Sequence, residues 1–146
     1  MQMDNHSAIE VSVVMPCLNE EQGVGICIDK IKKVFAQENI KGEIIVADNG
    51  STDRSAEIAQ ASGVLVVFES ERGYGAAYLA GLKEAKGKYI VIGDCDNSYD
   101  FLEIPKFLRK LREGFDFVLG SRFKGSIQKD AMTWLHRYIG NPILSW

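Results

Sequence analysis

The chain has 146 residues, of which 46% are hydrophobic and 25% are charged, and its formal net charge is -3. This composition, with a mean hydropathy of -0.08, is typical of one soluble globular domain and excludes a disordered chain. Because no block of Lys and Arg stands out, nucleic acid is not an expected partner. No apolar run approaches the ~18–20 residues of a transmembrane helix.

The first ten residues are polar, have no apolar signal-peptide core and are expected to form a flexible tail. The three cysteines, Cys17, Cys27 and Cys95, are odd in number and lack CxxC spacing. They suit reduced thiols in the core or at strand ends of a cytoplasmic protein. The sequence therefore predicts a single cytoplasmic domain over residues 11–146.

The first strand and helix are expected directly after this tail. Residues 11–15 form an apolar, β-branched run that predicts a buried strand, and Pro16 should stop it. Asn19 resembles a helix N-cap, with Glu20 and Glu21 in the first turn. Apolar residues then recur at helical spacing, which predicts a helix of about 16 residues.

The next elements repeat this alternation. Residues 43–47 predict a second strand, and the polar stretch 48–53 that follows it should cap a second helix. Residues 64–68 predict a third strand. A helix should then open at residues 73–75, and its small side chains would allow close packing on a sheet: Ala76, Ala77, Ala80 and Gly81.

The last elements run from residue 88 to the end of the chain. Residues 88–92 predict a fourth strand, and residues 115–119 a fifth. Between them, Asp100 should cap a helix that has Pro105 in its first turn. Residues 132–146 are expected to be helical, with an interruption at Pro142.

Strand and helix thus alternate five times, which predicts an α/β fold with a mostly parallel, Rossmann-like sheet flanked by helices. Ligands of such sheets bind outside the carboxyl ends of the strands. Every polar cluster of this chain falls at such an end, and five clusters on one edge predict a binding site. They comprise Asn19/Glu20, residues 48–53, residues 71–75, residues 94–97 and Ser121/Arg122.

Two carboxylates follow the fourth predicted strand, on Asp94 and Asp96. Carboxylates so close repel one another, so a fold tolerates them mainly where a cation lies between them. Oxygen ligands without His or Cys favour Mg2+ or Mn2+ over zinc. The alternative is a solvated Asp-rich turn.

Other chemistries have little support in the sequence. Gly73-Tyr74-Gly75 begins a dinucleotide fingerprint, but Tyr78 stands where the third glycine belongs. Neither a P-loop nor a GxSxG elbow occurs. His6 and His136 have no evident Ser or Cys partner. An acidic cation site and a strand-end arginine instead suit a diphosphate-containing donor.

Three motifs resemble glycosyltransferase family 2, whose fold is the GT-A fold: residues 13–21 (VVMPCLNEE), residues 46–53 (VADNGSTD) and Asp94-Cys95-Asp96, the DxD. Three more resemble the dolichyl- or polyprenyl-phosphate sugar transferases within that family: residues 72–77 (RGYGAA), 96–101 (DNSYDF) and 120–123 (GSRF). The resemblance runs in order from about residue 11 to residue 146.

The resemblance implies a role for each matching position of the donor site. Pro16, Leu18 and Glu20 would line the nucleotide pocket, although the family often has an aromatic residue where Leu18 stands. Asp48 would meet the N–H of the base, and Asn49 replaces the second acid of the family's usual pair. The resemblance places four further positions at the nucleotide sugar: Gly75, Asp94, Cys95 and Asp96.

The same resemblance implies the metal and acceptor groups. Asp96 would be the direct Mg2+ or Mn2+ ligand, and Asp94 a ribose or second metal contact. Arg122 would bind phosphate and, with Arg137 and Asn141, would hold a lipid-phosphate acceptor. The implied reaction is an inverting single displacement, in which Asp94, Asp96 and Arg122 act as catalytic residues. An acceptor of this kind would bring the protein to the inner face of the membrane.

Simpler interpretations remain for several of these residues. Glu20 would also suit a helix N-terminus, and Asp53, Tyr99 and Asp100 would suit caps and loop shaping. Cys95 would be a spacer whose side chain points into the core, and Arg72 a surface residue. Trp134 and Tyr138 suit either core packing or contact with a membrane surface.

Family members continue beyond the fifth predicted strand with acceptor-side segments, so the chain is expected to be truncated on that side. A non-catalytic nucleotide-sugar-binding domain is therefore one alternative function, and a nucleotidyltransferase is another. The second has less support, because residues 16–21 are acidic where such enzymes carry a Gly-rich, basic loop. The sequence leaves the sugar, the nucleotide and the oligomeric state open.

Overall fold

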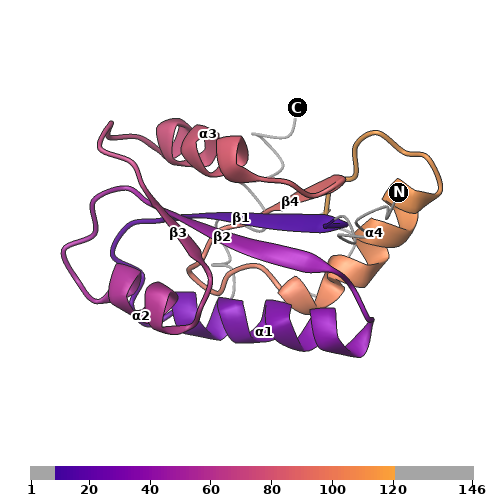
Figure 1. Ribbon diagram of the computed structural model, residues 1–146, viewed down its shortest axis with the longest axis horizontal. Helices are drawn as coiled ribbons and strands as arrows, with labels where there is room; N and C mark the ends of the chain where they lie inside the picture. The colour runs from indigo at the N-terminus through magenta and orange to yellow at the C-terminus, as the bar shows by residue number, and fades with distance from the viewer. Residues whose placement is uncertain (1–8, 121–146) are drawn as a thin grey trace, which may run out of the picture. The chain divides into compact units, whose positions relative to one another are not determined.

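The computed structural model describes residues 9–120, and the chain divides into two units, residues 1–116 and 117–146. In the first unit four strands form one parallel sheet in the order β3-β2-β1-β4 (Figure 1). The strands are β1 (Val11–Cys17), β2 (Gly42–Asp48), β3 (Leu65–Phe68) and β4 (Tyr89–Ile92). The helices are α1 (Val24–Gln37), α2 (Ser55–Ala61), α3 (Tyr74–Glu84) and α4 (Ile104–Arg112), the last preceded by the short 3-10 helix η1 (Phe101–Glu103).

Helices cover both faces of this sheet, with α3 on one face and α1 and α2 on the other (Figure 1). The predicted α/β architecture, with parallel strands separated by helices, is therefore confirmed. Sequential parallel strands need such crossover connections, because both strands run in the same direction. As a result β1, β2 and β4 all deliver their carboxyl ends to one edge.

The face under α3 depends on the small side chains of that helix. A Cβ added at Gly81 would lie 2.6 Å from Cγ1 of Val14 and 3.4 Å from Cβ of Ala47. The backbone of α3 therefore lies directly on β1 and β2, as the run of alanine and glycine predicted. Ala77 and Ala80 are buried at the same interface.

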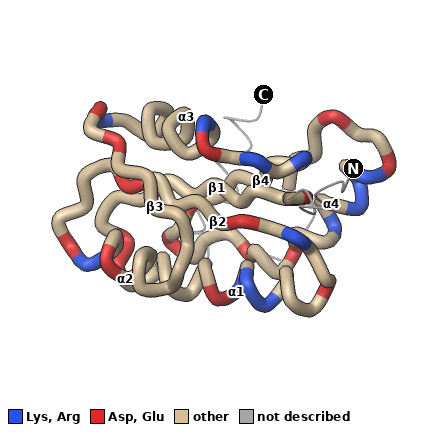
Figure 2. The backbone as a smooth tube through the Cα atoms, viewed as in Figure 1, with Lys and Arg blue, Asp and Glu red and all other residues tan. Residues whose placement is uncertain are grey.

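The opposite face holds the larger core. Side chains of β1 and β2 pack there against the apolar stripe of α1, and η1 and α4 close the cluster with Phe101, Ile104 and Leu108. Charged residues are nearly absent from the strands, where only Glu43 and Asp48 occur, and lie on loops and helix surfaces (Figure 2). The loops at the ends of the strands are therefore where charged side chains can form a site.

Pro16 does not stop the first strand, contrary to the prediction, because β1 continues through Pro16 to Cys17. The reason is that the backbone N–H and C=O groups of successive residues in β1 point alternately toward β2 and toward β4. The Val14 carbonyl oxygen accepts a hydrogen bond from the N–H of Gly93, so alternate residues of β1 face β4. The β1–β4 ladder has ended at Val14, so the missing N–H of Pro16 removes no hydrogen bond.

Asn19 is not the N-cap of the first helix, so that prediction is wrong. The helix begins at Val24, after a turn in which the Glu20 carbonyl accepts hydrogen bonds from the N–H groups of Gly23 and Val24. Asn19 instead takes a left-handed backbone conformation, with φ 57°. Its Oδ1 accepts a hydrogen bond of 2.8 Å from the N–H of Thr52, and this contact between loops replaces the local cap.

The predicted caps of the later helices are confirmed only for η1, because the N-cap residues of α2 and α4 are Arg54 and Glu103 and make no side-chain cap hydrogen bond. The Asp53 carboxylate accepts a hydrogen bond of 2.9 Å from the N–H of Ser55, the first residue of α2. Asp100 accepts one of 3.1 Å from the N–H of Leu102 and so caps η1. Pro105 lies in the first turn of α4.

Residues 115–119 form no strand, so the fifth strand predicted there is wrong. The apolar side chains of Phe115, Phe117 and Leu119 are 56%, 76% and 79% exposed. Alternating apolar residues form a strand only when a neighbour supplies the ladder, and these residues pair with no strand of the described part. The helix predicted over residues 132–146 lies outside the described residues.

Candidate nucleotide-sugar site

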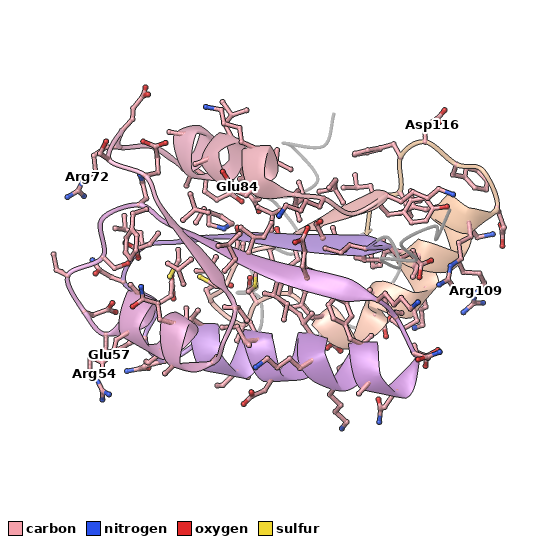
Figure 3. All side chains as sticks on the ribbon, viewed as in Figure 1. Arg54, Glu57, Arg72, Glu84, Arg109 and Asp116 are labelled. Carbon is pink, nitrogen blue, oxygen red and sulfur yellow. The ribbon has the colours of Figure 1, made fainter. Side chains whose placement is uncertain are left out.

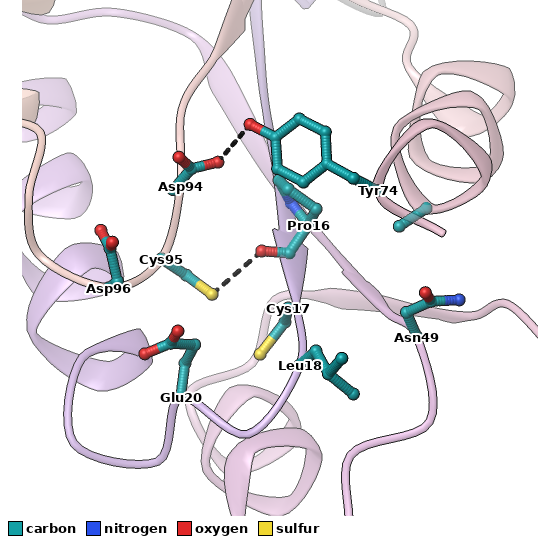
Figure 4. Close-up of a pocket in the computed structure, with 10 residues that line it drawn as sticks. Pro16, Cys17, Leu18, Glu20, Asn49, Tyr74, Asp94, Cys95 and Asp96 are labelled. Atoms are coloured by element: carbon teal, nitrogen blue, oxygen red, sulfur yellow. Dashed lines mark hydrogen bonds between the residues drawn. The ribbon is translucent and has the colours of Figure 1, made fainter. Parts of the chain in front are cut away.

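A cavity of about 280 Å³ opens at the carboxyl ends of the strands (Figure 4). Ten residues line it, and seven of them belong to the site predicted from the sequence: Pro16, Leu18, Glu20, Asn49, Asp94, Cys95 and Asp96. Cys17, Tyr74 and Ala77 complete the lining. The view in Figure 4 has the three carboxylates on one side of the cavity and Leu18 and Asn49 on the other.

The loop after β4 carries the two carboxylates, and Cys95 fixes this loop. The Cys95 side chain is buried, and its Sγ donates a hydrogen bond of 3.0 Å to the Pro16 carbonyl oxygen (Figure 4). The predicted spacer role of Cys95 is confirmed. Because Cys95 points inward, its neighbours Asp94 and Asp96 extend toward the cavity.

The loop after β4 also rests on the turn before α1. A Cβ added at Gly23 would lie 2.4 Å from the Cys95 carbonyl oxygen and 3.0 Å from Cα of Asp96. Next to it, the Lys30 Nζ donates a hydrogen bond of 2.9 Å to the side chain of Asn97. The main chain of the Asp94–Asp96 segment therefore packs against the turn before α1, and the side chain of Lys30 on α1 holds the neighbouring Asn97.

Asp94 accepts hydrogen bonds from two tyrosines of α3. The Tyr74 hydroxyl donates to Asp94 Oδ1 at 2.6 Å, and the Tyr78 hydroxyl reaches the same oxygen at 3.4 Å. Burial first, and then the hydrogen bond to Asp94, raises the pKa of Tyr74; burial also raises the pKa of Tyr78. Both phenols thus remain protonated donors at neutral pH.

Asn49 joins the end of β2 to the loop before α3. Its Nδ2 donates hydrogen bonds to the carbonyl oxygens of Glu69, at 3.0 Å, and Glu71, at 2.7 Å. Its Oδ1 accepts one of 2.8 Å from the N–H of Gly73. An aspartate here would turn both donors into acceptors facing carbonyl oxygens, which is a physical reason for an amide at this position.

Asp48 lies at the buried end of β2 but does not line the cavity. Its Oδ2 accepts hydrogen bonds of 3.1 Å from the N–H groups of Gly50 and Ser51. Its Oδ1 is buried and has no hydrogen-bond partner within the described residues. A buried oxygen without a donor is costly, so Asp48 offers an open acceptor beside the cavity.

Glu20 shows the electrostatic effect of the acidic wall. Burial and the neighbouring carboxylates Asp96, Asp53 and Asp94 raise the pKa of Glu20. Helix α1 begins at Val24 and has no acidic residue in its first turn, so Glu20 does not take the first-turn position that compensates a helix N-terminus. A cation between these carboxylates would relieve their repulsion.

The donor set fits a hard divalent cation that takes part of its ligands from a substrate. Asp96 Oδ1 accepts a hydrogen bond of 2.8 Å from the N–H of Ser98, and each DxD carboxylate keeps its second oxygen without a partner in the described part of the chain. Among residues 9–120, no group of three or more His, Cys, Asp or Glu side chains could by itself hold a metal. Two carboxylates with substrate phosphates are the arrangement that Mg2+ commonly uses.

Two further positions that the sequence singled out lie outside the cavity. Gly75 is exposed in the first turn of α3 and does not line it. Arg72 is also exposed and extends outward from the loop before α3 (Figure 3), as the alternative interpretation of this residue held. Arg122, Arg137 and Asn141 lie outside the described residues.

The sequence reasoning missed Cys17, Tyr74, Tyr78 and Ala77 as site residues. All three cysteines are free and buried, as predicted. The neighbouring Cys95 thiol lowers the pKa of Cys17, while its interaction with Cys17 and then burial raise the pKa of Cys95. The spacing of Tyr74 and Tyr78, four residues apart at the start of a helix, was the available signal for the tyrosine pair.

A parallel α/β sheet with a cavity at its carboxyl ends, walled by carboxylates, places the protein among the open α/β domains that bind ligands at this edge of the sheet. The family described as glycosyl transferase family 2 matches residues 12–145. The chain therefore belongs to glycosyl transferase family 2, and its fold is the GT-A fold predicted from the motifs.

Two relatives come from the archaeon Haloferax volcanii. The low-salt glycan biosynthesis hexosyltransferase Agl6 is 45% identical over 143 residues, which are 97% of this chain and 34% of that protein. A dolichyl-phosphate hexose transferase is 33% identical over 120 residues, 82% of this chain and 51% of its own length. The chain thus spans about a third to a half of these relatives.

Among solved structures, the chain resembles glucosyl-3-phosphoglycerate synthase from Mycobacterium tuberculosis in complex with Mn2+, UDP and glucosyl-3-phosphoglycerate. The TM-score is 0.60 at 31% identity, and the alignment covers 70% of this chain and 39% of the synthase. Mannosyl-3-phosphoglycerate synthase from Rubrobacter xylanophilus aligns with a TM-score of 0.57 at 28% identity, over 60% of this chain and 31% of that one. Within residues 9–120, no helix combines the length and apolar character needed to cross a bilayer.

Proposed function

We propose that the chain supplies the donor site of a transferase that moves a hexose from a nucleoside-diphosphate sugar to a phosphorylated acceptor. One observation carries the proposal. Glu20, Asp94 and Asp96 line the cavity, and no Lys or Arg of the described part does. Such a wall repels an anionic diphosphate, so the donor binds only with a divalent cation between the carboxylates and the phosphates.

Asp96 is proposed to hold this Mg2+ or Mn2+ directly, and Asp94 to contact the ribose or a second position on the metal. When bound, the cation neutralises the charge that develops on the departing diphosphate. The Mn2+ and UDP in the complex of the mycobacterial synthase support a divalent cation together with a nucleoside diphosphate. The open carboxylate oxygens of Asp94 and Asp96 support it independently.

The nucleotide base is proposed to lie on the side of the cavity away from the acids. Leu18 is 42% exposed there, beside Pro16, and gives the base an apolar surface in place of an aromatic ring. The unpartnered Oδ1 of Asp48 is suited to accept an N–H of the base, after a small movement that opens it to the cavity. Asn49, whose amide is fully used, holds the loop before α3 in place.

The acceptor is proposed to be a polyprenyl phosphate, which the name of the dolichyl-phosphate hexose transferase relative supports. Its phosphate oxygen attacks the anomeric carbon while the bond from that carbon to the diphosphate breaks, so the configuration inverts. The acceptor is already anionic near neutral pH, so no strong base is required. Arg122, Arg137 and Asn141 are proposed to bind the phosphates, at the inner face of a membrane.

Calorimetry of the 146-residue chain with UDP and GDP, each with and without Mn2+ or Mg2+, tests the donor site. Affinity for one nucleotide should require the metal. The Asp96→Ala variant should lose at least about tenfold of that affinity, because it lacks the direct ligand. Asp29→Ala is the matched control, since Asp29 is exposed on α1.

Unchanged affinity in the Asp96→Ala variant would contradict the assignment. Transfer of radiolabelled hexose to undecaprenyl or dolichyl phosphate then tests the reaction. Metal-dependent binding without any transfer would identify this chain as a donor-binding domain alone.

A further inference from the structure

Two phenol groups converge on one oxygen of Asp94. The Tyr74 hydroxyl donates to Asp94 Oδ1 at 2.6 Å, and the Tyr78 hydroxyl lies 3.4 Å from that oxygen (Figure 4 shows the first contact). The two hydroxyls are also 3.4 Å from each other. Asp94 Oδ2 has no hydrogen-bond partner among residues 9–120, so the carboxylate is held on one side and open on the other.

The start of α3 creates this convergence. Gly73, with φ 144°, turns the chain into the helix, and Tyr74 is the first helical residue. Tyr78 follows four residues later on the same face of the helix. The rings meet edge to face with centroids 4.9 Å apart, which fixes their hydroxyls side by side.

We propose that Tyr74 and Tyr78 are positioning residues that orient the Asp94 carboxylate, so that Oδ2 faces the cation and the donor. The inference rests on the proposed donor site and adds the two residues that act through Asp94. A carboxyl group rotates easily about its terminal bond, and its two orientations present different oxygens. Donors on Oδ1 remove that freedom before the ligand arrives.

The exposure of Tyr74 indicates that its hydroxyl does more than stabilise the fold. Its side chain lines the cavity and is 61% exposed, so the ring contributes little to the core. Its shortest polar contact is to a proposed metal-site carboxylate 20 residues further along the chain. Partners that hydrogen-bond to metal ligands commonly raise metal affinity tenfold to a hundredfold.

The test is a titration of the 146-residue chain with Mn2+ alone, with the free ion measured by electron paramagnetic resonance. The variants are Tyr74→Phe, Tyr78→Phe and the double variant, which keep both rings and remove only the hydroxyls. Tyr89→Phe is the matched control, because Tyr89 starts β4 at the end away from the cavity and its hydroxyl makes no hydrogen bond within the described residues. Asp96→Asn reports on the metal site itself.

The double variant should bind Mn2+ about tenfold or more weakly, and Tyr74→Phe more weakly than Tyr78→Phe, because Tyr74 makes the shorter contact. The metal-free melting temperature of the double variant should match that of Tyr89→Phe. Wild-type Mn2+ affinity in the double variant overturns the inference. A lower melting temperature with unchanged Mn2+ affinity also overturns it, since the tyrosines would then be structural.

The control variants separate this inference from the proposed function. If Asp96→Asn weakens Mn2+ binding and the tyrosine variants do not, the positioning role fails while the donor site stands. If the unmodified chain binds Mn2+ only in the presence of UDP, the same comparison of variants is made with UDP present. If it binds Mn2+ neither alone nor with UDP, both fail.

Discussion

The polar groups at the two edges of the sheet differ in how completely they are hydrogen-bonded within the protein. At the amino-terminal edge, the buried Ser12 hydroxyl donates to Glu43 Oε1 at 2.5 Å and accepts from the N–H of Gly87 at 2.8 Å. Glu43 Oε1 accepts a second hydrogen bond, from the N–H of Lys86 at 2.7 Å. This network satisfies its own members and needs no ligand.

At the carboxyl-terminal edge the network is incomplete. Asp48 Oδ1 is buried without a partner, and Glu20, Asp94 and Asp96 crowd one wall of the cavity. Neighbouring carboxylates contribute to raising the pKa of Glu20. At the amino-terminal edge, removing a polar side chain should therefore lower the free energy of unfolding. At the carboxyl-terminal edge, removing a carboxylate should weaken ligand binding and raise the free energy of unfolding.

The largest effect is expected from Gly23→Ala at the carboxyl-terminal edge. The new Cβ would lie 2.4 Å from the Cys95 carbonyl oxygen, and main chain cannot rotate away as a side chain can. Overpacking of this kind costs about 1–3 kcal/mol, and displacement of the loop should also weaken Mn2+ binding. Urea unfolding and Mn2+ titration measure the two effects.

Gly25→Ala is the control for that substitution. Its Cβ would meet only the side chain of Ile58, at 3.3 Å, and alanine favours a helix interior. If Gly23→Ala unfolds at the same urea concentration as Gly25→Ala and binds Mn2+ equally well, the supporting role of the turn is wrong.

Ser12→Ala at the amino-terminal edge should come second. It removes the buried Ser12 hydroxyl and leaves the half-buried N–H of Gly87 without its acceptor, which costs about 1 kcal/mol. Metal-dependent nucleotide affinity should not change. Urea unfolding, with the exposed Ser70→Ala as control, gives the first quantity and calorimetry the second. A loss of nucleotide affinity would mean that the two edges are not independent.

Glu20→Gln should have the smallest effect, and its sign should depend on pH. Because the folded chain raises the pKa of Glu20, stability associated with this group is present below its unfolded pKa and is lost as pH rises through the folded value. Removing the charge should therefore raise the free energy of unfolding at neutral pH, by about a few tenths of a kcal/mol. The gain should vanish toward pH 4.

Thermal unfolding from pH 4 to pH 8 without metal checks this prediction. Glu84→Gln is the control, as Glu84 is exposed at the end of α3 (Figure 3). With Mn2+ the order should reverse, because the wild-type carboxylate helps to attract the cation. A difference between wild type and variant that is constant over pH would contradict the role of the acidic wall.

The sequence predicted the sheet because its strands are short apolar runs with polar residues at both ends. It predicted the acidic wall for a related reason: in parallel sheets, the carboxyl ends of strands share one edge. Asp94 and Asp96 could thus be placed beside Glu20 without coordinates. The small residues of α3 likewise predicted close packing, which Gly81 confirms.

The missed features depend on contacts between segments that are distant in the chain. Asn19 fits the local rule for a cap, but a hydrogen bond to Thr52, 33 residues away, decides its conformation. Asn49 resembles a site amide, yet its contacts with residues 69–73 use all of its donors. The hydrogen bonds from the tyrosines to Asp94 also join residues that are distant in sequence. Residues 115–119 would likewise need a neighbouring strand, and a local pattern does not reveal whether one is present.

The central position of β1 also has a consequence for the order of folding. Val11 of β1 pairs with Tyr89 of β4, and the Cys95 thiol meets the Pro16 carbonyl oxygen across 79 residues of chain. Contacts this distant in sequence form late and slow the folding of a domain. During synthesis, the β1–β2 pair is available well before β4 and the loop that carries Asp94 and Asp96 emerge. The cavity is therefore completed late in synthesis, and a nascent chain that ends before residue 94 lacks both Asp94 and Asp96.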